Sequence, residues 1–208
     1  MKRTALLAVL VLSLGVIGCS EMPSMPAWMP GSGWTTLIDG EKGLENFERV
    51  GDANWRAQDG AITADSGKGG FLLSKRSYKD FELRAEFWAD HNANSGIYMR
   101  CSDPKNLNDK SCYEANIFDQ RPDQTYATGG IVHRGKVLKP VKAGGQWNVY
   151  EITAKGSRMT VVLNGIKTAE IDNVESSSGP FALQYGTLPP KGAPGGAIRW
   201  RKVQVKEI

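Results

Sequence analysis

Apolar and polar residues alternate over short runs in this chain, and this pattern restricts it to a fold built from β-strands. In residues 81–87, four apolar side chains fall on one face and the charged side chains fall on the other, as is typical of a half-buried antiparallel strand. From Trp34 onward, the sequence keeps no 3.6-residue apolar period for three turns. The pattern therefore predicts an all-β domain.

A hairpin is expected at Asn164-Gly165, between the strand-like runs 158–163 and 166–171. Both residues tolerate positive φ, as a two-residue type I′ turn requires. Further strands are expected at 61–63, 71–74, 147–154, 181–185 and 197–208. Roughly a dozen strands in about 175 residues predict a two-sheet antiparallel jelly-roll sandwich. We expect one such domain, spanning residues 34–208.

The N-terminus has the features of an export signal. Residues 1–18 combine a basic start with an apolar stretch that is too short to span a bilayer stably. The stretch ends in Gly18-Cys19, which resembles a bacterial lipobox. The resemblance implies cleavage before Cys19 and acylation of that cysteine, which would anchor the chain to a membrane. An ordinary signal peptide is the alternative.

Residues 19–33 are expected to form a tether between the lipidated cysteine and the domain. The segment is rich in Met and Pro, and proline opposes both helix and ladder pairing. Ser20 stands where an Asp would resemble an inner-membrane retention signal. The expected location is therefore the bacterial cell envelope, at the outer membrane and facing the periplasm.

Charge and motif content exclude several partners and cofactors. The net charge is +4, and the basic residues are scattered, which argues against nucleic acid. The sequence has no Gly-rich loop between a strand and a helix, so a nucleotide is not expected. The sequence contains only two His residues, which excludes a His-rich metal site. No cofactor is firmly implied, although residues 103–109 offer the oxygen ligands that Ca²⁺ prefers.

Cys101 and Cys112 are the remaining cysteines. An exported chain meets oxidising surroundings, so a disulfide between them is the default expectation. The bridge would close the polar loop 102–111 at the start of the strand that begins at Tyr113. Two buried free thiols are the alternative.

Several segments together resemble one known family. They are 36–40, 55–62, 78–87, 94–100, 113–119, 147–148, 163–165, 179–184 and 198–201. In this order and spacing they resemble the 3-keto-disaccharide hydrolase family, a 3-keto-glucoside 1,2-lyase and 3-keto-2-hydroxy-glucal hydratase domain. The resemblance implies a concanavalin A-like sandwich that cleaves 3-keto-glucosides by elimination and hydration. It also implies a carbohydrate ligand and a separate sugar 3-oxidoreductase that makes it.

Two positions depart from the family pattern. Many members carry a His shortly after the late-strand Gln, whereas here Tyr185 follows Gln184. Asn116 stands where the family commonly has Gln. These departures bear on whether catalysis is retained.

The implied reaction needs a base, an electropositive group beside a developing enolate, and an acid for the leaving group. On the strand from Tyr113, Glu114 and Asn116 share one face, while the other face is more apolar and should meet the core. We therefore expect Glu114 to be catalytic and Asn116 to bind substrate. Asp119, at the strand end, is a second catalytic candidate. The structural alternatives for Glu114 are a solvated residue at a sheet edge and a salt bridge to Arg100.

Other candidates come from other segments. Arg100 closes the strand from Gly96 and suits an oxyanion, with a surface ion pair as the alternative. Substrate-binding candidates are Gln184, a polar residue within an apolar strand, and His133, which could titrate near neutral pH. A histidine with no role beyond its loop or strand edge is the alternative for His133. Trp147 and Arg201 complete the set, since aromatic and polar groups side by side suit a sugar ring. No residue is assigned to a metal.

Three kinds of protein remain compatible with these residues. The first is an envelope lipoprotein that cleaves 3-keto-glucosides. The second is a non-catalytic carbohydrate-binding module, and the third is an envelope interaction protein with the same fold.

Overall fold

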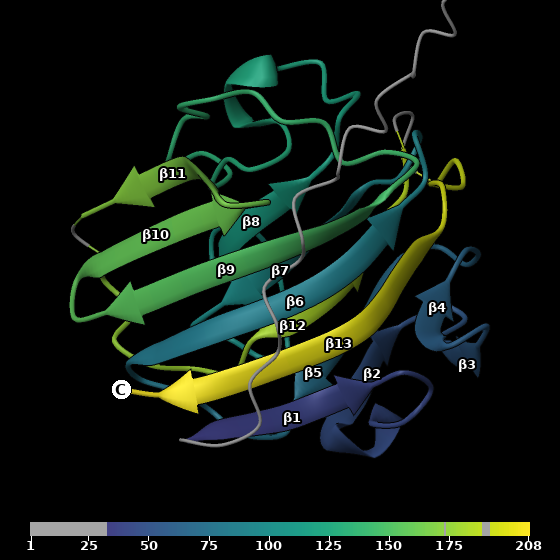
Figure 1. The fold of residues 1–208 in the computed structure, drawn as a ribbon, viewed down its shortest axis with the longest axis horizontal. Coiled ribbons are helices and arrows are strands. Elements are labelled where there is room, and N and C mark those ends of the chain that lie inside the picture. The colour runs from purple at the N-terminus through teal and green to yellow at the C-terminus, as the bar shows by residue number, and fades with distance from the viewer. Residues whose placement is uncertain (1–32, 173, 189–191) are drawn as a thin grey trace, which may run out of the picture. The chain divides into compact units, whose positions relative to one another are not determined.

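A computed structural model describes residues 33–172, 174–188 and 192–208, which form two layers of antiparallel strands (Figure 1). In chain order the elements are β1 (Trp34–Asp39), η1 (Leu44–Asn46), β2 (Phe47–Gly51), β3 (Arg56–Gln58), β4 (Ala61–Ala64), β5 (Gly70–Ser74), β6 (Phe81–Ala89), β7 (Ser95–Met99), β8 (Tyr113–Ile117), η2 (Gln124–Tyr126), β9 (Trp147–Lys155), β10 (Arg158–Leu163), β11 (Ile166–Ile171), β12 (Ala182–Tyr185) and β13 (Ile198–Glu207).

The two sheets have different sizes. Within the described residues, the larger sheet has eight strands in the order β11-β10-β9-β6-β13-β4-β3, with β1 also paired to β13. The smaller sheet has five strands in the order β2-β5-β12-β7-β8. Neighbouring strands are often far apart in sequence, as in a concanavalin A-like jelly-roll sandwich. The predicted fold class is therefore confirmed.

The core lies between the sheets and follows the alternation in the sequence. Phe81, Leu83, Ala85 and Phe87 of β6 are all fully buried, as predicted. From the smaller sheet, Tyr113, Ala115 and Ile117 of β8 join the same apolar cluster. Burial of these apolar side chains is the main term that holds the sheets together.

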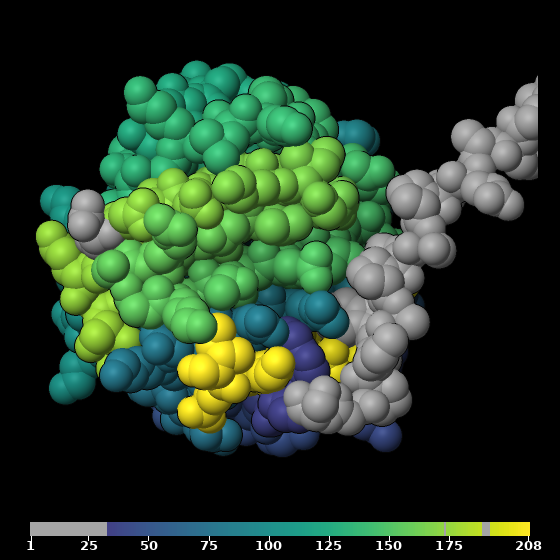
Figure 2. Space-filling model, turned by 60° about the vertical axis from the view of Figure 1, so that its left-hand side comes forward, coloured from purple at the N-terminus to yellow at the C-terminus, as the bar shows by residue number. Residues whose placement is uncertain are grey.

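The predicted hairpin is present between β10 and β11. Leu163 pairs with Ile166 across the turn. Asn164 and Gly165 both have positive φ, 52° and 77°, as a type I′ turn requires. At the opposite edge of this sheet, β1 pairs with β13. In the space-filling view the yellow C-terminal residues accordingly lie against the purple first strand (Figure 2).

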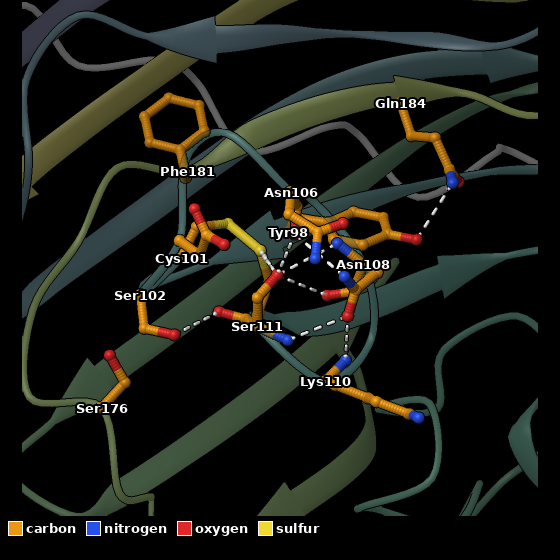
Figure 3. Close-up of a disulfide and its surroundings, with 12 residues drawn as sticks. Tyr98, Cys101, Ser102, Asn106, Asn108, Lys110, Ser111, Ser176, Phe181 and Gln184 are labelled. Carbon is orange, nitrogen blue, oxygen red and sulfur yellow. Dashed lines mark hydrogen bonds between the residues drawn. A yellow bond between two sulfur atoms is a disulfide. The ribbon is translucent and has the colours of Figure 1, made fainter.

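Cys101 and Cys112 form the predicted disulfide. The bridge closes the loop between β7 and β8, and this loop lies beside Tyr98 (Figure 3). Leu107 of the loop packs against a small cluster of buried residues that contains both cysteines and Tyr98. The disulfide therefore fixes a loop that covers part of the smaller sheet.

The predicted signal peptide, the lipidated Cys19 and nearly all of the tether lie outside the described residues. Among the residues that are described, no helix is long and apolar enough to cross a membrane.

Candidate functional site

Glu114 and Asn116 lie on the outer face of the smaller sheet, the face turned away from the larger sheet. They alternate along β8 with Tyr113, Ala115 and Ile117, which enter the core. Both are buried, because neighbouring loops cover them. The backbone of Gly129 and Gly130 bonds to Asn116, and the Asn116 amide donates to the carbonyl of Tyr126 at 2.6 Å.

Gly96 makes room for the Glu114 carboxylate. Gly96 of β7 pairs with Asn116, and Tyr98 pairs with Glu114. A Cβ added at Gly96 would lie 2.9 Å from Glu114 Oε1. The carboxylate therefore leans over this glycine, and a larger residue would displace it.

Tyr98 connects Glu114 to Gln184. The Gln184 amide donates to the Tyr98 hydroxyl at 3.0 Å (Figure 3). The Tyr98 hydroxyl in turn hydrogen-bonds to Glu114, which lowers the pKa of the carboxyl. Phe71 of β5 packs edge-on against the Tyr98 ring at 5.0 Å between centroids. Three neighbouring strands thus hold one hydrogen-bonded chain that ends at a buried carboxylate.

The surroundings of Glu114 place its titration near neutral pH. Burial raises its pKa to about 7, against opposing effects of the Tyr98 hydrogen bond and of the nearby Arg121. Asp109 of the disulfide loop raises it further. The pKa of Tyr98 is also well above its ordinary value, chiefly because the phenol is buried. A carboxyl with a pKa near 7 can both take and return a proton.

A cavity of about 480 Å³ extends the same face beyond Gly96 and Asn116. Asn94, two residues before Gly96, and Phe118, two residues after Asn116, both line it. Its other lining residues are Arg121, Pro122, Asp123, Thr187 and Leu188. The volume is within the range of small-molecule sites.

Two buried amide oxygens flank Gly96 in the same row of the sheet. Leu183 of β12 pairs with Ile97 of β7, so the next residue of β12, Gln184, falls beside Gly96. On the other side of β7, Asn116 pairs with Gly96. Among the described residues, Gln184 Oε1 and Asn116 Oδ1 have no hydrogen-bond donor. Unpaired buried acceptors are unfavourable by about 1–3 kcal/mol each, so donors from a ligand would satisfy a need that the protein leaves open.

The predicted role of Arg100 needs correction. Residue 100 follows the end of β7 and has a φ of 45°, so its side chain leaves the outer face. The fully buried guanidinium donates to Lys79 O at 2.8 Å and Gly156 O at 2.7 Å, and pairs with Asp80 at 3.0 Å. These contacts bind loops together and do not bring Arg100 to Glu114.

Asp119 also has a structural environment. Its carboxylate accepts hydrogen bonds from the Thr128 hydroxyl at 2.6 Å and from the backbone of Ala143 and Gly144 at 3.0 and 2.9 Å. With its oxygens occupied in this way, Asp119 is an anchor between loops. The structure does not present it as a second carboxylate beside Glu114.

His133 lies on a loop near the site. Its Nε2 is 3.2 Å from Asp109 Oδ2, and its ring contacts the Tyr126 ring edge-on at 5.5 Å. The side chain is exposed. Because Asp109 acts on the pKa of Glu114, the His133–Asp109 pair belongs to the periphery of the site.

Trp147 and Arg201 belong to the other sheet. Arg201 lies over the Trp147 ring at 4.1 Å and pairs with Glu86 at 2.8 Å. Trp147 lies in β9, Arg201 in β13 and Glu86 in β6, all strands of the larger sheet. The expectation that these two residues line a common site with Glu114 is therefore corrected. Cation–π contact and the ion pair give them a structural role in the sheet.

The described residues contain no group of three or more His, Cys, Asp or Glu side chains that could hold a metal ion. Asp103, at the start of the loop with oxygen ligands, accepts a hydrogen bond from the backbone of Lys105.

The site also contains residues that the sequence did not single out. Tyr98 shares the strand face of Gly96, so period-two alternation was a usable signal. Its partner Gln184 comes from a strand 86 residues away, which alternation does not reveal. Arg121 lies in a turn after β8, where its backbone N–H donates to Phe118 O at 3.3 Å, and no periodic pattern marks it.

Two antiparallel sheets packed face to face define the class of protein: a concanavalin A-like β-sandwich, here with a buried carboxylate on the outer face of the smaller sheet. More specifically, the chain belongs to the family of 3-keto-alpha-glucoside-1,2-lyase-like domains, whose model matches residues 33–206.

Solved structures agree on the fold. A candidate glycosyl hydrolase from Parabacteroides distasonis superimposes with a TM-score of 0.71 at 16% identity, over 85% of this chain and 94% of that chain. A second one from the same organism gives 0.64 at 23% identity, over 85% and 100%. The carbohydrate-binding module CBM66 from Bacillus subtilis gives 0.57 at 16% identity, over 85% and 96%. No curated protein matches the sequence.

Proposed function

We propose that this chain cleaves 3-keto-glucosides, with Glu114 as the base. The observation that carries the proposal is a buried carboxylate with a pKa of about 7 on the strand that leads to Phe118, which lines a cavity of about 480 Å³, in a chain of the 3-keto-alpha-glucoside-1,2-lyase-like family. A ketone at carbon 3 acidifies the hydrogen on carbon 2, so no nucleophile is required. General-base catalysis is most effective when the pKa is near the working pH.

The proposed reaction has two steps. Glu114 takes the proton from carbon 2, the bond between carbon 1 and the aglycone oxygen breaks, and a double bond forms between carbons 1 and 2. Water gives a proton to the departing aglycone oxygen. The remaining hydroxide adds to carbon 1, and Glu114 returns its proton to carbon 2. The net reaction consumes one water and releases the aglycone and 3-ketoglucose.

Release of 3-ketoglucose tests this proposal directly. The purified protein is incubated with 3-keto-trehalose, 3-keto-sucrose and a 3-keto-aryl-glucoside, beside the Glu114→Gln variant. Glu48→Gln is the matched control, because Glu48 is exposed on β2. We expect release that falls by about 10²-fold or more in Glu114→Gln and is unchanged in the control. Release that survives in Glu114→Gln would move the base elsewhere.

A second candidate is a non-catalytic sugar-binding domain that uses the same face. Tyr185 favours it, because this residue follows Gln184 where many family members carry a His, and its side chain is fully buried. Binding of unoxidised glycans on an array, with no release from any 3-keto substrate, would support this candidate.

We also propose that Cys19 carries the lipid that holds the domain at the outer membrane, and that a separate sugar 3-oxidoreductase supplies the substrate. Mass spectrometry of the mature N-terminus tests the anchor, and an unmodified Cys19 would refute it.

A further inference from the structure

Arg121 is a cation at the cavity, and its charge acts on the carboxylates of Asp123 and Glu114. It lines the cavity together with Asn94, Phe118 and Thr187. Among the described residues, its side chain makes no ion pair, and its buried Nε has no hydrogen-bond acceptor. A buried N–H without an acceptor is unfavourable, so the side chain is prepared for an acceptor from outside the chain.

The backbone that carries Arg121 is held firmly. Its N–H donates to Phe118 O, and its carbonyl accepts from the Gln124 amide. Asp119, two residues earlier, anchors the same turn to Thr128 and to the backbone of Ala143 and Gly144. The guanidinium is therefore presented from a fixed turn, which favours electrostatic stabilisation without reorganisation.

Arg121 also acts electrostatically on the proposed base. Its positive charge acts on Glu114, yet the two do not form an ion pair. The guanidinium at the cavity therefore acts electrostatically on the proposed base.

We infer that Arg121 holds the carbon-3 oxygen of a 3-keto sugar and stabilises the enolate that forms there; this inference rests on the proposed function. When Glu114 takes the proton from carbon 2, the bonding pair forms a double bond between carbons 2 and 3. The carbonyl π pair moves onto the carbon-3 oxygen, and the guanidinium donates hydrogen bonds to that negative oxygen. When the carbonyl re-forms, the pair between carbons 2 and 3 moves to form the double bond between carbons 1 and 2, and the bond from carbon 1 to the aglycone oxygen breaks. This is the part that the sequence had assigned to Arg100.

The unpaired amide oxygens are consistent with the same orientation. Gln184 Oε1 and Asn116 Oδ1 flank Gly96 and lack donors, and sugar hydroxyl groups are donors of the right kind. An Arg donor for the ketone and amide acceptors for hydroxyls would distinguish a 3-keto sugar from its unoxidised parent.

The test separates enolate formation from cleavage. The substrate is a 1-deoxy-3-keto sugar, which has no leaving group on carbon 1 and reports only exchange of the carbon-2 hydrogen for deuterium in D₂O, followed by NMR. The proteins are the wild type, Arg121→Gln, Arg121→Lys and Arg134→Gln. The last is a matched loss of charge, because Arg134 is exposed and lies over the Tyr113 ring, outside the cavity.

We expect exchange to fall by about 10²–10³-fold in Arg121→Gln, to recover partly in Arg121→Lys, and to stay at the wild-type rate in Arg134→Gln. With a cleavable substrate, the loss should fall on kcat more than on KM. Thermal unfolding confirms that the variants are folded. If the wild type and Arg121→Gln exchange hydrogen at the same rate, the role of Arg121 is refuted and the proposed function is not. No exchange by the wild type would refute the proposed function and this inference together.

Discussion

Replacing Glu114 by Gln should change how protein stability depends on pH. A Glu in the unfolded chain titrates near its ordinary value of about 4.5, whereas burial raises the pKa of folded Glu114 to about 7. Between these values the folded state binds more protons than the unfolded state. The stability contribution of this group is therefore greatest at low pH and falls as pH rises from about 4.5 to about 7.

The expected size follows from the gap between the two pKa values. It corresponds to about 3 kcal/mol of lost folding stability above pH 7, or roughly 6–12 °C in Tm for a domain of this size. Gln has no carboxyl to ionise, so the Glu114→Gln variant should escape this loss. Relative to the wild type, it should gain about 3 kcal/mol between pH 4.5 and pH 8.

Urea unfolding at pH 4.5, 5.5, 6.5, 7.5 and 8.5 measures this difference, with Glu48→Gln as the exposed control. Other titrating groups contribute equally to the wild type and to the variants, and therefore cancel. A difference between Glu114→Gln and wild type that stays constant across this range would refute the reasoning, because Glu114 would then titrate as it does in the unfolded chain.

Three further substitutions test neighbouring parts of the structure. Tyr98→Phe removes the hydroxyl that hydrogen-bonds to Glu114 and accepts from Gln184. The pKa of Glu114 should then rise above about 7, which moves the acid limb of the pH–rate profile to higher pH. Loss of the two hydrogen bonds should reduce the free energy of unfolding by about 1–2 kcal/mol. An unmoved limb would contradict the hydrogen bond. Arg100→Lys keeps the charge but loses contacts to three carbonyl or carboxylate partners, so the free energy of unfolding should fall by about 2–4 kcal/mol. Activity per folded molecule should persist. Loss of kcat in fully folded protein would show that Arg100 acts in the reaction. Replacing Cys101 and Cys112 by Ala should reduce the free energy of unfolding by about 3 kcal/mol, and an unchanged urea midpoint would show that the loop needs no bridge.

Sequence alternation predicted the faces of strands well, because the side-chain period of a strand is fixed by its pleat. This is why the core face of β6 and the outward direction of Glu114 on β8 could be derived from sequence alone. The rule fails where a strand stops. Arg100 was expected to close the strand from Gly96, but β7 ends at Met99 and the positive φ of Arg100 directs its side chain away from the outer face.

Neighbour relations between strands were beyond reach for a different reason. The contact between Gln184 and Tyr98 depends on β12 lying beside β7, and the order of strands in a sheet is not encoded in any local period. For the same reason Trp147 and Arg201, which look suitable for a sugar ring, were grouped with Glu114 although they belong to the larger sheet. The chemistry of a side chain indicates what it can bind, whereas the topology of the sheets determines which other residues lie beside it.

The proposed reaction also explains why a chain would keep a carboxylate under such cover. Burial of Glu114 destabilises the folded state at neutral pH by the amount argued above, and it is avoidable by a Gln. In the proposed two-step reaction the same group must accept a proton from carbon 2 and later return it. A carboxyl of ordinary pKa takes a proton from carbon poorly, whereas one near 7 does both steps with similar ease. Gly96 is part of the same arrangement, because the space above it is where the carboxylate lies. A glycine in a strand interior is unfavourable in itself, so Gly96 and Glu114 both reduce stability at the same place on the outer face of the smaller sheet.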